Sequence, residues 1–164
     1  MKCSEICALI EQEYGTEYAC DWDNVGLLAG RSTKEVKKIL LSLDATDEVV
    51  RMAVEGGYDM LITHHPMLFS AIKRVTDQDM NGRRLLELIH NDISYYAMHT
   101  NYDTRGMADL AARLMGLTEC AVLEEVKDGE GIGRVGKLPH PMTLRECGEQ
   151  VKVAYGIPNV RLFG

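Results

Sequence analysis

Two adjacent histidines, His64 and His65, close an apolar run at residues 60–63. A later apolar run ends in His99, and Asp103 follows four residues further on. Imidazole nitrogens and carboxylate oxygens are the protein ligands of zinc and of related divalent metals. Because functional side chains of α/β proteins gather where the strands end, the pattern predicts a metal site at one edge of a sheet.

The histidine pair needs a particular geometry to bind metal. In an extended strand successive side chains point to opposite faces, so two neighbouring imidazoles cannot easily bind the same ion. At the end of a strand, where Pro66 turns the chain, His64 and His65 can point toward two ions side by side. This arrangement is typical of dinuclear hydrolytic centres, whose ions lie roughly 3.5–4 Å apart. We therefore interpret the pair as metal ligands and not as a chance pair on the surface.

Other polar residues allow more than one role. Asp103 is favoured as a ligand, although an aspartate there could also cap a helix that begins near Gly106. His99 is either a ligand or the hydrogen-bond partner of one, and it is the candidate catalytic residue. Asp44 follows an apolar run, and it fits the N-cap of a helix over residues 45–55 better than a place in the same crevice.

The remaining candidates are weaker. Asp21 and Asp23 flank Trp22 in a polar stretch that fits a turn better than a substrate-facing loop. His90 falls at the expected end of a helix, where a cation is favourable, and His140 stands between two prolines. We assign none of these residues to the site.

Composition narrows the class of protein. The 164 residues, 46% of them hydrophobic and 26% charged, are typical of one globular domain over residues 1–164. The net charge of −7 argues against a nucleic-acid partner. No segment approaches the roughly 20 apolar residues of a membrane span. Five cysteines without a C-x-x-C pair predict reduced thiols in a cytoplasmic protein.

Apolar periodicity predicts alternating strands and helices. The expected helices cover residues 4–14, 45–55, the segment marked by Leu85 and Leu88, and residues 107–115; the expected strands are 27–29, 39–43, 58–63 and 93–98. The segment 39–43 is too uniformly apolar for a surface helix, and it and the segment 58–63 are predicted as buried strands, as parallel strands are. The fold class is therefore predicted as α/β, with a mostly parallel sheet and helices on both faces.

The last third of the chain is predicted with less regularity. We expect a mobile connector over residues 119–131, a strand over 133–138, a helix opened by the capping box of Thr143 and Glu146, and a final strand over 159–163. Residues 131–136 spell G-x-G-x-x-G, but the dinucleotide fingerprint needs a strand before it and a helix after it. We therefore predict no dinucleotide cofactor.

Five motifs in this order resemble the Nif-three-like family, also called dinuclear metal centre proteins or type-two homologues of GTP cyclohydrolase I. They are Asp23-Asn24-Val25-Gly26-Leu27, Leu43-Asp44-Ala45-Thr46, Ile62-Thr63-His64-His65-Pro66, His99-Thr100-Asn101-Tyr102-Asp103 and Gly131-Ile132-Gly133-Arg134-Val135-Gly136. The resemblance implies two similar α/β lobes, a two-metal site between them and a hexameric ring. It also implies that His64, His65 and Asp103 are metal ligands.

One element of the family is missing. The resemblance implies an H-x-x-x-E pair near the C-terminus, but no histidine follows His140. We therefore expect the chain to correspond to the N-terminal lobe only, either as a piece of a longer protein or as a natural half-length form.

The expected function follows from the metal site. The resemblance implies a metal-binding protein with up to two zinc, iron or manganese ions, and a possible hydrolase acting on a nucleotide or phosphoester. The alternative is a non-catalytic metal-binding scaffold or interaction protein with an incomplete site. The expected partners are further copies of the chain, in a homo-oligomer, and a small anionic substrate.

Overall fold

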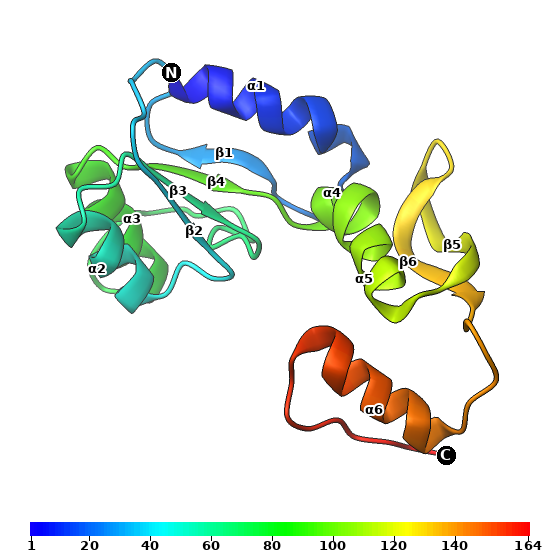
Figure 1. The fold of residues 1–164 in the computed structure, drawn as a ribbon. Coiled ribbons are helices and arrows are strands. Elements are labelled where there is room, and N and C mark those ends of the chain that lie inside the picture. Colours follow the sequence, from blue (N-terminus) through cyan, green and yellow to red (C-terminus); the bar gives the residue numbers. More distant parts are fainter. The chain divides into compact units, whose positions relative to one another are not determined.

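The computed structural model describes residues 1–164, which form two compact units, Met1–Tyr102 and Asp103–Gly164 (Figure 1). The elements of the first unit are α1 (Cys3–Glu13), η1 (Thr16–Tyr18), β1 (Gly26–Ala29), β2 (Ile39–Ser42), α2 (Asp47–Glu55), β3 (Met60–Thr63), α3 (Met80–His90), β4 (Ser94–Ala97) and α4 (Thr100–Tyr102). Those of the second are η2 (Asp103–Met107), α5 (Ala108–Met115), β5 (Thr118–Lys127), β6 (Glu130–Lys137) and α6 (Leu144–Tyr155). The single domain 1–164 expected from the sequence stays a prediction.

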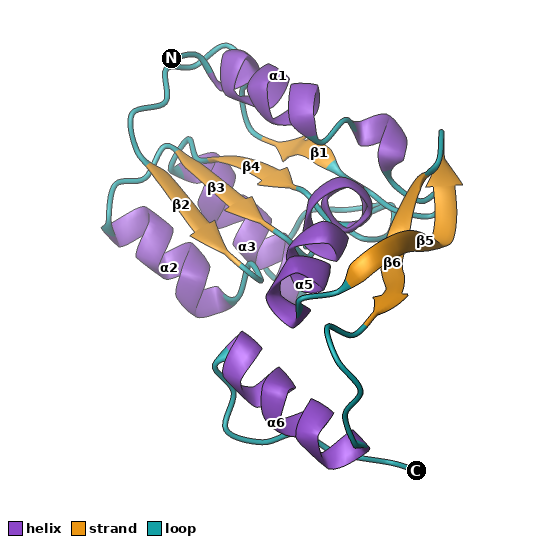
Figure 2. Cartoon of the chain, turned by 45° about the vertical axis from the view of Figure 1, so that its right-hand side comes forward, coloured by secondary structure: helices purple, strands orange, loops and turns teal.

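The first unit contains a four-stranded sheet in the order β1-β4-β3-β2. The strands β2, β3 and β4 are parallel, while β1 runs antiparallel to β4. Helix α1 covers one face of the sheet, and α2 and α3 cover the other (Figure 2). The predicted fold class, a mostly parallel α/β sheet with helices on both faces, is confirmed.

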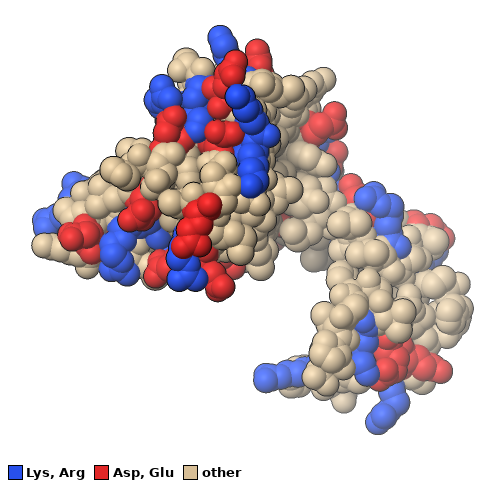
Figure 3. Space-filling model, turned by 60° about the vertical axis from the view of Figure 1, so that its left-hand side comes forward, with Lys and Arg blue, Asp and Glu red and all other residues tan.

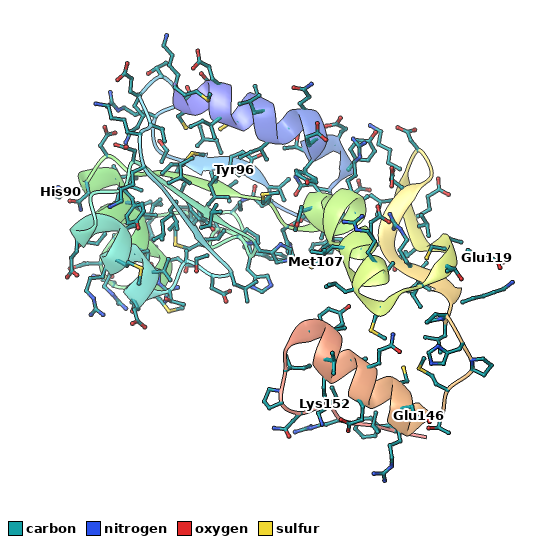
Figure 4. All side chains as sticks on the ribbon, in the orientation of Figure 1. His90, Tyr96, Met107, Glu119, Glu146 and Lys152 are labelled. Atoms are coloured by element: carbon teal, nitrogen blue, oxygen red, sulfur yellow. The ribbon has the colours of Figure 1, made fainter.

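Strand β3 divides its side chains between two cores because successive residues point to opposite faces. Met60 and Ile62 pack with Cys3 and Cys7 of α1, whereas Leu61 packs in the core formed with α2 and α3. On β4, Tyr95 joins the core that contains Leu61, and its neighbour Tyr96 joins the core beneath α1 (Figure 4). All residues of β3 and β4 are buried.

The prediction that the strand at residues 39–43 is buried was wrong. The structure confirms the strand, but β2 lies at the edge of the sheet and pairs only with β3. Leu41 is 72% exposed and Leu43 is 58% exposed. A uniformly apolar strand is buried on both faces only where helices cover both, and the α1 face of β2 has no such cover.

The ends of three helices show which local sequence signals were sufficient to predict a helix boundary. Helix α6 begins at the predicted capping box, in which Thr143 Oγ1 accepts from the Glu146 amide and the Glu146 carboxylate accepts from the Thr143 amide. Helix α5 ends at Gly116 in the left-handed conformation. The N-cap of α2 is Thr46, which accepts from the Val49 amide, so the prediction of Asp44 as the cap was wrong.

The second unit corrects two further predictions. Residues 119–131 are no irregular connector, because β5 and β6 form an antiparallel hairpin whose pairing has two register shifts. Its two-residue turn is Asp128-Gly129, with φ of 52° and 78°, as a type I′ turn requires. Residues 159–163 form no strand, since they pair with no other strand of the structure.

The G-x-G-x-x-G segment lies within β6, and strand packing explains its first glycine. A Cβ atom at Gly131 would lie 1.9 Å from the carbonyl oxygen of Glu124 on β5. Gly133 has a φ of 73°, which L side chains rarely adopt. The glycines are therefore needed by the hairpin itself.

The surface carries charges of both signs, and the helices are those of a chain without long apolar segments. Lysine and arginine are interspersed with aspartate and glutamate over the face shown in Figure 3. None of the helices has the length and apolar character needed to cross a membrane.

Two leucines on neighbouring strands test the assignment of core and edge. Leu61→Ala should lower the free energy of unfolding by about 2–5 kcal/mol, because Leu61 is fully buried. Leu41→Ala removes the same atoms from a side chain that is 72% exposed, and it should change stability by less than about 0.5 kcal/mol. Urea unfolding followed by the fluorescence of Trp22 measures both. Equal losses would contradict the assignment.

Candidate metal centre

Three histidines of the first unit form a cluster. His64, His65 and His99 each offer a ligand nitrogen, and these atoms lie within 4.8 Å of one another. Their ring centroids are separated by 4.9 Å, 5.1 Å and 5.6 Å. His90 is at the end of α3 and does not belong to the cluster (Figure 4).

Parallel pairing of β3 with β4 brings the histidines together. The two strands are in register, with Thr63 opposite Ala97, so both end at the same edge of the sheet. The amide of Met98 continues the pairing by donating to the carbonyl of Thr63 at 3.0 Å. His64 and His99 therefore leave neighbouring strands at almost the same level.

Each imidazole of the cluster has its Nδ1 atom hydrogen-bonded to an oxygen. His64 Nδ1 lies 3.0 Å from the carbonyl oxygen of Met98, His65 Nδ1 lies 2.8 Å from Asp44 Oδ1, and His99 Nδ1 lies 3.1 Å from Asp23 Oδ1. Carbonyl and carboxylate oxygens can only accept, so each Nδ1 carries the proton. In the neutral form of each ring Nε2 is the nitrogen that can bind a metal, and metal-binding histidines typically donate their other ring N–H to an oxygen in this way.

Asp23 is the most constrained of these acceptors. Its side chain is fully buried and accepts from His99 Nδ1, from the Thr100 amide at 3.0 Å and from Thr100 Oγ1 at 2.5 Å. Burial alone would raise the pKa of Asp23, but the hydrogen bonds from Thr100 and His99 outweigh it and hold the pKa below its ordinary value. The carboxylate is therefore ionised at neutral pH and fixes the ring of His99.

The hydroxyl of Tyr95 holds the turn that carries the histidine pair. It accepts from the Met67 amide at 2.7 Å, and it lies 2.8 Å from Thr63 Oγ1. Thr63 Oγ1 in turn donates to the carbonyl of His65 at 2.8 Å. Burial raises the pKa of Tyr95, against the opposing effect of these hydrogen bonds. The phenol thus stays protonated and fixes the chain on both sides of His64 and His65.

Some of the residues predicted for the site lie together in the structure, and one residue given another role lies beside them. His64, His65 and His99 come together as predicted, and Asp44 lies beside His65 instead of capping α2. Asp103 is the first residue of the second unit and begins the π-helical turn η2, so its role as a ligand stays a prediction.

The role of Asp23 could not be predicted from the local sequence, which favours a turn at this position. Asp23 and His99 are 76 residues apart, and no local pattern links a loop aspartate to a distant histidine. The only available signal was the Asp23-Asn24-Val25-Gly26-Leu27 motif of the family resemblance.

These features define a mixed α/β protein with a histidine cluster at the carboxyl ends of two parallel strands. The model of the Duf34/NIF3 (NGG1p interacting factor 3) family matches residues 1–164, and the chain belongs to this family. A relative from Clostridium perfringens, named GTP cyclohydrolase 1 type 2 homolog, is 36% identical over 168 residues. That match covers 100% of the chain, which spans only 64% of the relative's length.

Solved structures give the same result. A hypothetical protein of Staphylococcus aureus has a TM-score of 0.85 and 29% identity, over 98% of this chain and 66% of that one. HcgD from Methanocaldococcus jannaschii, in its reduced form, has a TM-score of 0.83 and 35% identity, over 93% of this chain and 60% of that one. The similarity therefore covers nearly the whole chain and about two thirds of each relative.

Removing the Tyr95 hydroxyl should weaken the fold and loosen the histidine pair. Tyr95→Phe leaves the buried Met67 amide without its acceptor, which should cost about 1–3 kcal/mol of unfolding free energy. Tyr96→Phe is the control, because Tyr96 donates only one longer bond, of 3.3 Å, to Glu11. Denaturant unfolding of the two variants compares them, and a larger loss in Tyr96→Phe would refute the role given to Tyr95.

Asp23→Asn should weaken the metal binding proposed for the cluster without removing any imidazole. The amide keeps the shape of the carboxylate but loses the charge and one acceptor oxygen, so His99 and Thr100 are held less firmly. Loss of such a partner typically lowers metal affinity by about 10–100-fold. Competition with a chromophoric chelator measures the change. The exposed Asp21→Asn variant should bind as the parent does, and equal effects at both positions would argue against the orienting role.

Proposed function

We propose that this protein binds a divalent metal ion through Nε2 of His64, His65 and His99. The observation that carries the proposal is that all three rings have Nδ1 bonded to an oxygen, which leaves Nε2 as the nitrogen for a metal. The ligand nitrogens of the three residues also lie within 4.8 Å of one another. Three imidazoles also match the number of protein ligands that a catalytic zinc ion usually has.

The ligand nitrogens of the cluster can hold either one metal ion or two. Nitrogens bound to one zinc ion at about 2.0–2.1 Å lie at most roughly 4.2 Å apart. The cluster spans up to 4.8 Å, which suits one ion after small side-chain rotations or two neighbouring ions. Zinc, iron and manganese are the metals we propose, since imidazole and carboxylate donors suit all three. Asp103 is the proposed carboxylate ligand.

The proposed activity is metal-dependent hydrolysis of a small anionic substrate, a nucleotide or a phosphoester. A bound divalent ion would polarise the substrate and supply a hydroxide near neutral pH. In this chain Asp23 would keep His99 in one orientation, and His99 would bind the metal or move a proton. The name of the relatives, GTP cyclohydrolase 1 type 2 homolog, supports a nucleotide as the substrate.

A second candidate function is a non-catalytic metal-binding scaffold. Asp23 and Asp44 each bond an imidazole of the cluster, and both are already used in orienting it. Because both carboxylates are engaged, neither is available as a general base for hydrolysis. This favours a metal ion with a structural or regulatory role.

Assembly and location are also proposals. The exposed apolar side chains of β2 support a homo-oligomer, with the hexameric ring implied by the family resemblance as its proposed form. The five free cysteines, two of them buried in the core beneath α1, support a reducing compartment such as the cytoplasm.

Elemental analysis of protein purified without chelators tests the metal site. We expect one to two zinc, iron or manganese ions per chain, and a loss of most of this metal in His65→Ala. His90→Ala is the matched control, because it removes an exposed histidine outside the cluster. Circular dichroism should show that both variants are folded. Metal-free parent protein, or equal loss in both variants, would refute the site.

Turnover separates the two candidate functions. Metal-loaded protein that hydrolyses a nucleotide or phosphoester, with activity lost in His65→Ala and kept in His90→Ala, would support the enzyme. Tightly bound metal without turnover across such a panel would support the scaffold.

A further inference from the structure

Two exposed aromatic side chains lie beside the histidine cluster. Trp22 is 59% exposed and Phe69 is 50% exposed, yet their rings contact each other with centroids 5.7 Å apart. Trp22 also meets the ring of His99 edge to face, at a centroid distance of 6.2 Å. An aromatic surface therefore continues directly from one of the proposed ligands.

The loops that carry these rings are held in place. Asn24 Nδ2 donates to the carbonyl of Leu68 at 2.5 Å, which ties the residues next to Trp22 to those next to Phe69. On the other side of the same loop, the Asp23 carboxylate is fixed by His99 and Thr100. The exposure of Trp22 is thus a property of an ordered loop whose neighbouring residues are bonded on both sides.

This arrangement is costly unless something covers the rings. Aromatic side chains have the largest apolar surfaces of all residues, and Trp is highly buried on average. The loop buries Asp23, a charged residue, while it leaves the indole of Trp22 in solvent. The sequence has only one tryptophan and two phenylalanines, so two of these three side chains are placed at the cluster.

We propose that Trp22 and Phe69 form a stacking surface for a planar heteroaromatic ring, such as a purine. The ring would lie against the exposed indole, and the polar end of the same ligand would reach the histidine cluster. This second half rests on the proposed function, since it needs a metal-binding site there. A flat ring fits because aromatic side chains stack on the faces of bases. Such stacking depends little on which base is bound, since every base has a π-face.

The single tryptophan gives a direct readout of stacking. In metal-loaded protein, guanosine 5′-monophosphate should quench the fluorescence of Trp22 in a saturable way, after correction for its absorbance. Ribose 5-phosphate, which has the phosphate but no ring, should not. Phe69→Ala should weaken the guanosine monophosphate affinity by roughly 5–150-fold, the range expected for one stacked base. Phe163→Ala, which removes the other exposed phenylalanine, should leave it unchanged.

Calorimetry provides a second measurement that does not depend on fluorescence. Trp22→Ala should lower the affinity for guanosine monophosphate at least as much as Phe69→Ala does, with the same metal content as the parent protein. Circular dichroism should show a fold like that of the parent in each variant.

The outcomes separate this inference from the metal site. Metal-loaded protein whose Trp22 fluorescence is unchanged by guanosine monophosphate would overturn the stacking surface and leave the proposed function standing. Saturable quenching in metal-free protein would support the stacking surface and show that the ring binds without a metal ion. Quenching by ribose 5-phosphate, or a Trp22 signal that depends only on protein concentration, would overturn the inference in favour of an anion site or of contact between copies.

Discussion

The buried hydroxyl of Tyr95 is the group on which the geometry of the histidine cluster depends. It stands on β4 but bonds to Thr63 and to the Met67 amide, on the two sides of the histidine pair. An apolar side chain at this position would fill the core equally well, yet it would leave a buried amide without an acceptor. The residue that joins the two strands inside the core is therefore also the one that sets the position of His64 and His65.

A second layer of constraint comes from acceptors that lie far away in the sequence. Asp23 precedes β1, Asp44 follows β2, and the carbonyl of Met98 follows β4. Each fixes one imidazole at Nδ1, so three separate segments of the sheet contribute to one orientation. The cluster is consequently a property of the folded unit, and no single stretch of the chain could form it.

Local sequence signals predicted the parts of the fold that depend on local physics. The capping box at Thr143 and the end of the helix at residue 115 were correct because a helix end is determined within a few residues. The parallel sheet followed from alternating strands and helices. The hairpin of β5 and β6 was missed although Asp128-Gly129 is a strong turn signal, because the charged residues around it favoured a loop.

Other features could not be found from local patterns. The exposure of β2 depends on which strand lies at the edge, and the apolar residues 39–43 are the same in either case. The grouping of His64, His65 and His99 was predictable, because each of these residues closely follows the end of a strand. The role of Asp23 needed a contact across 76 residues, and that of Asp44 needed the position of His65.

The alternation of side chains along β3 has a consequence for how this protein can change. Leu61 and Ile62 belong to different cores, and the same two-residue period sets where His64 and His65 leave the strand. Inserting or deleting one residue in β3 would exchange the two cores and turn His65 away from Asp44. Errors in strand alignment and loss of the histidine cluster are thus one event, so the grouping of the three imidazoles depends on the correct alignment of β3.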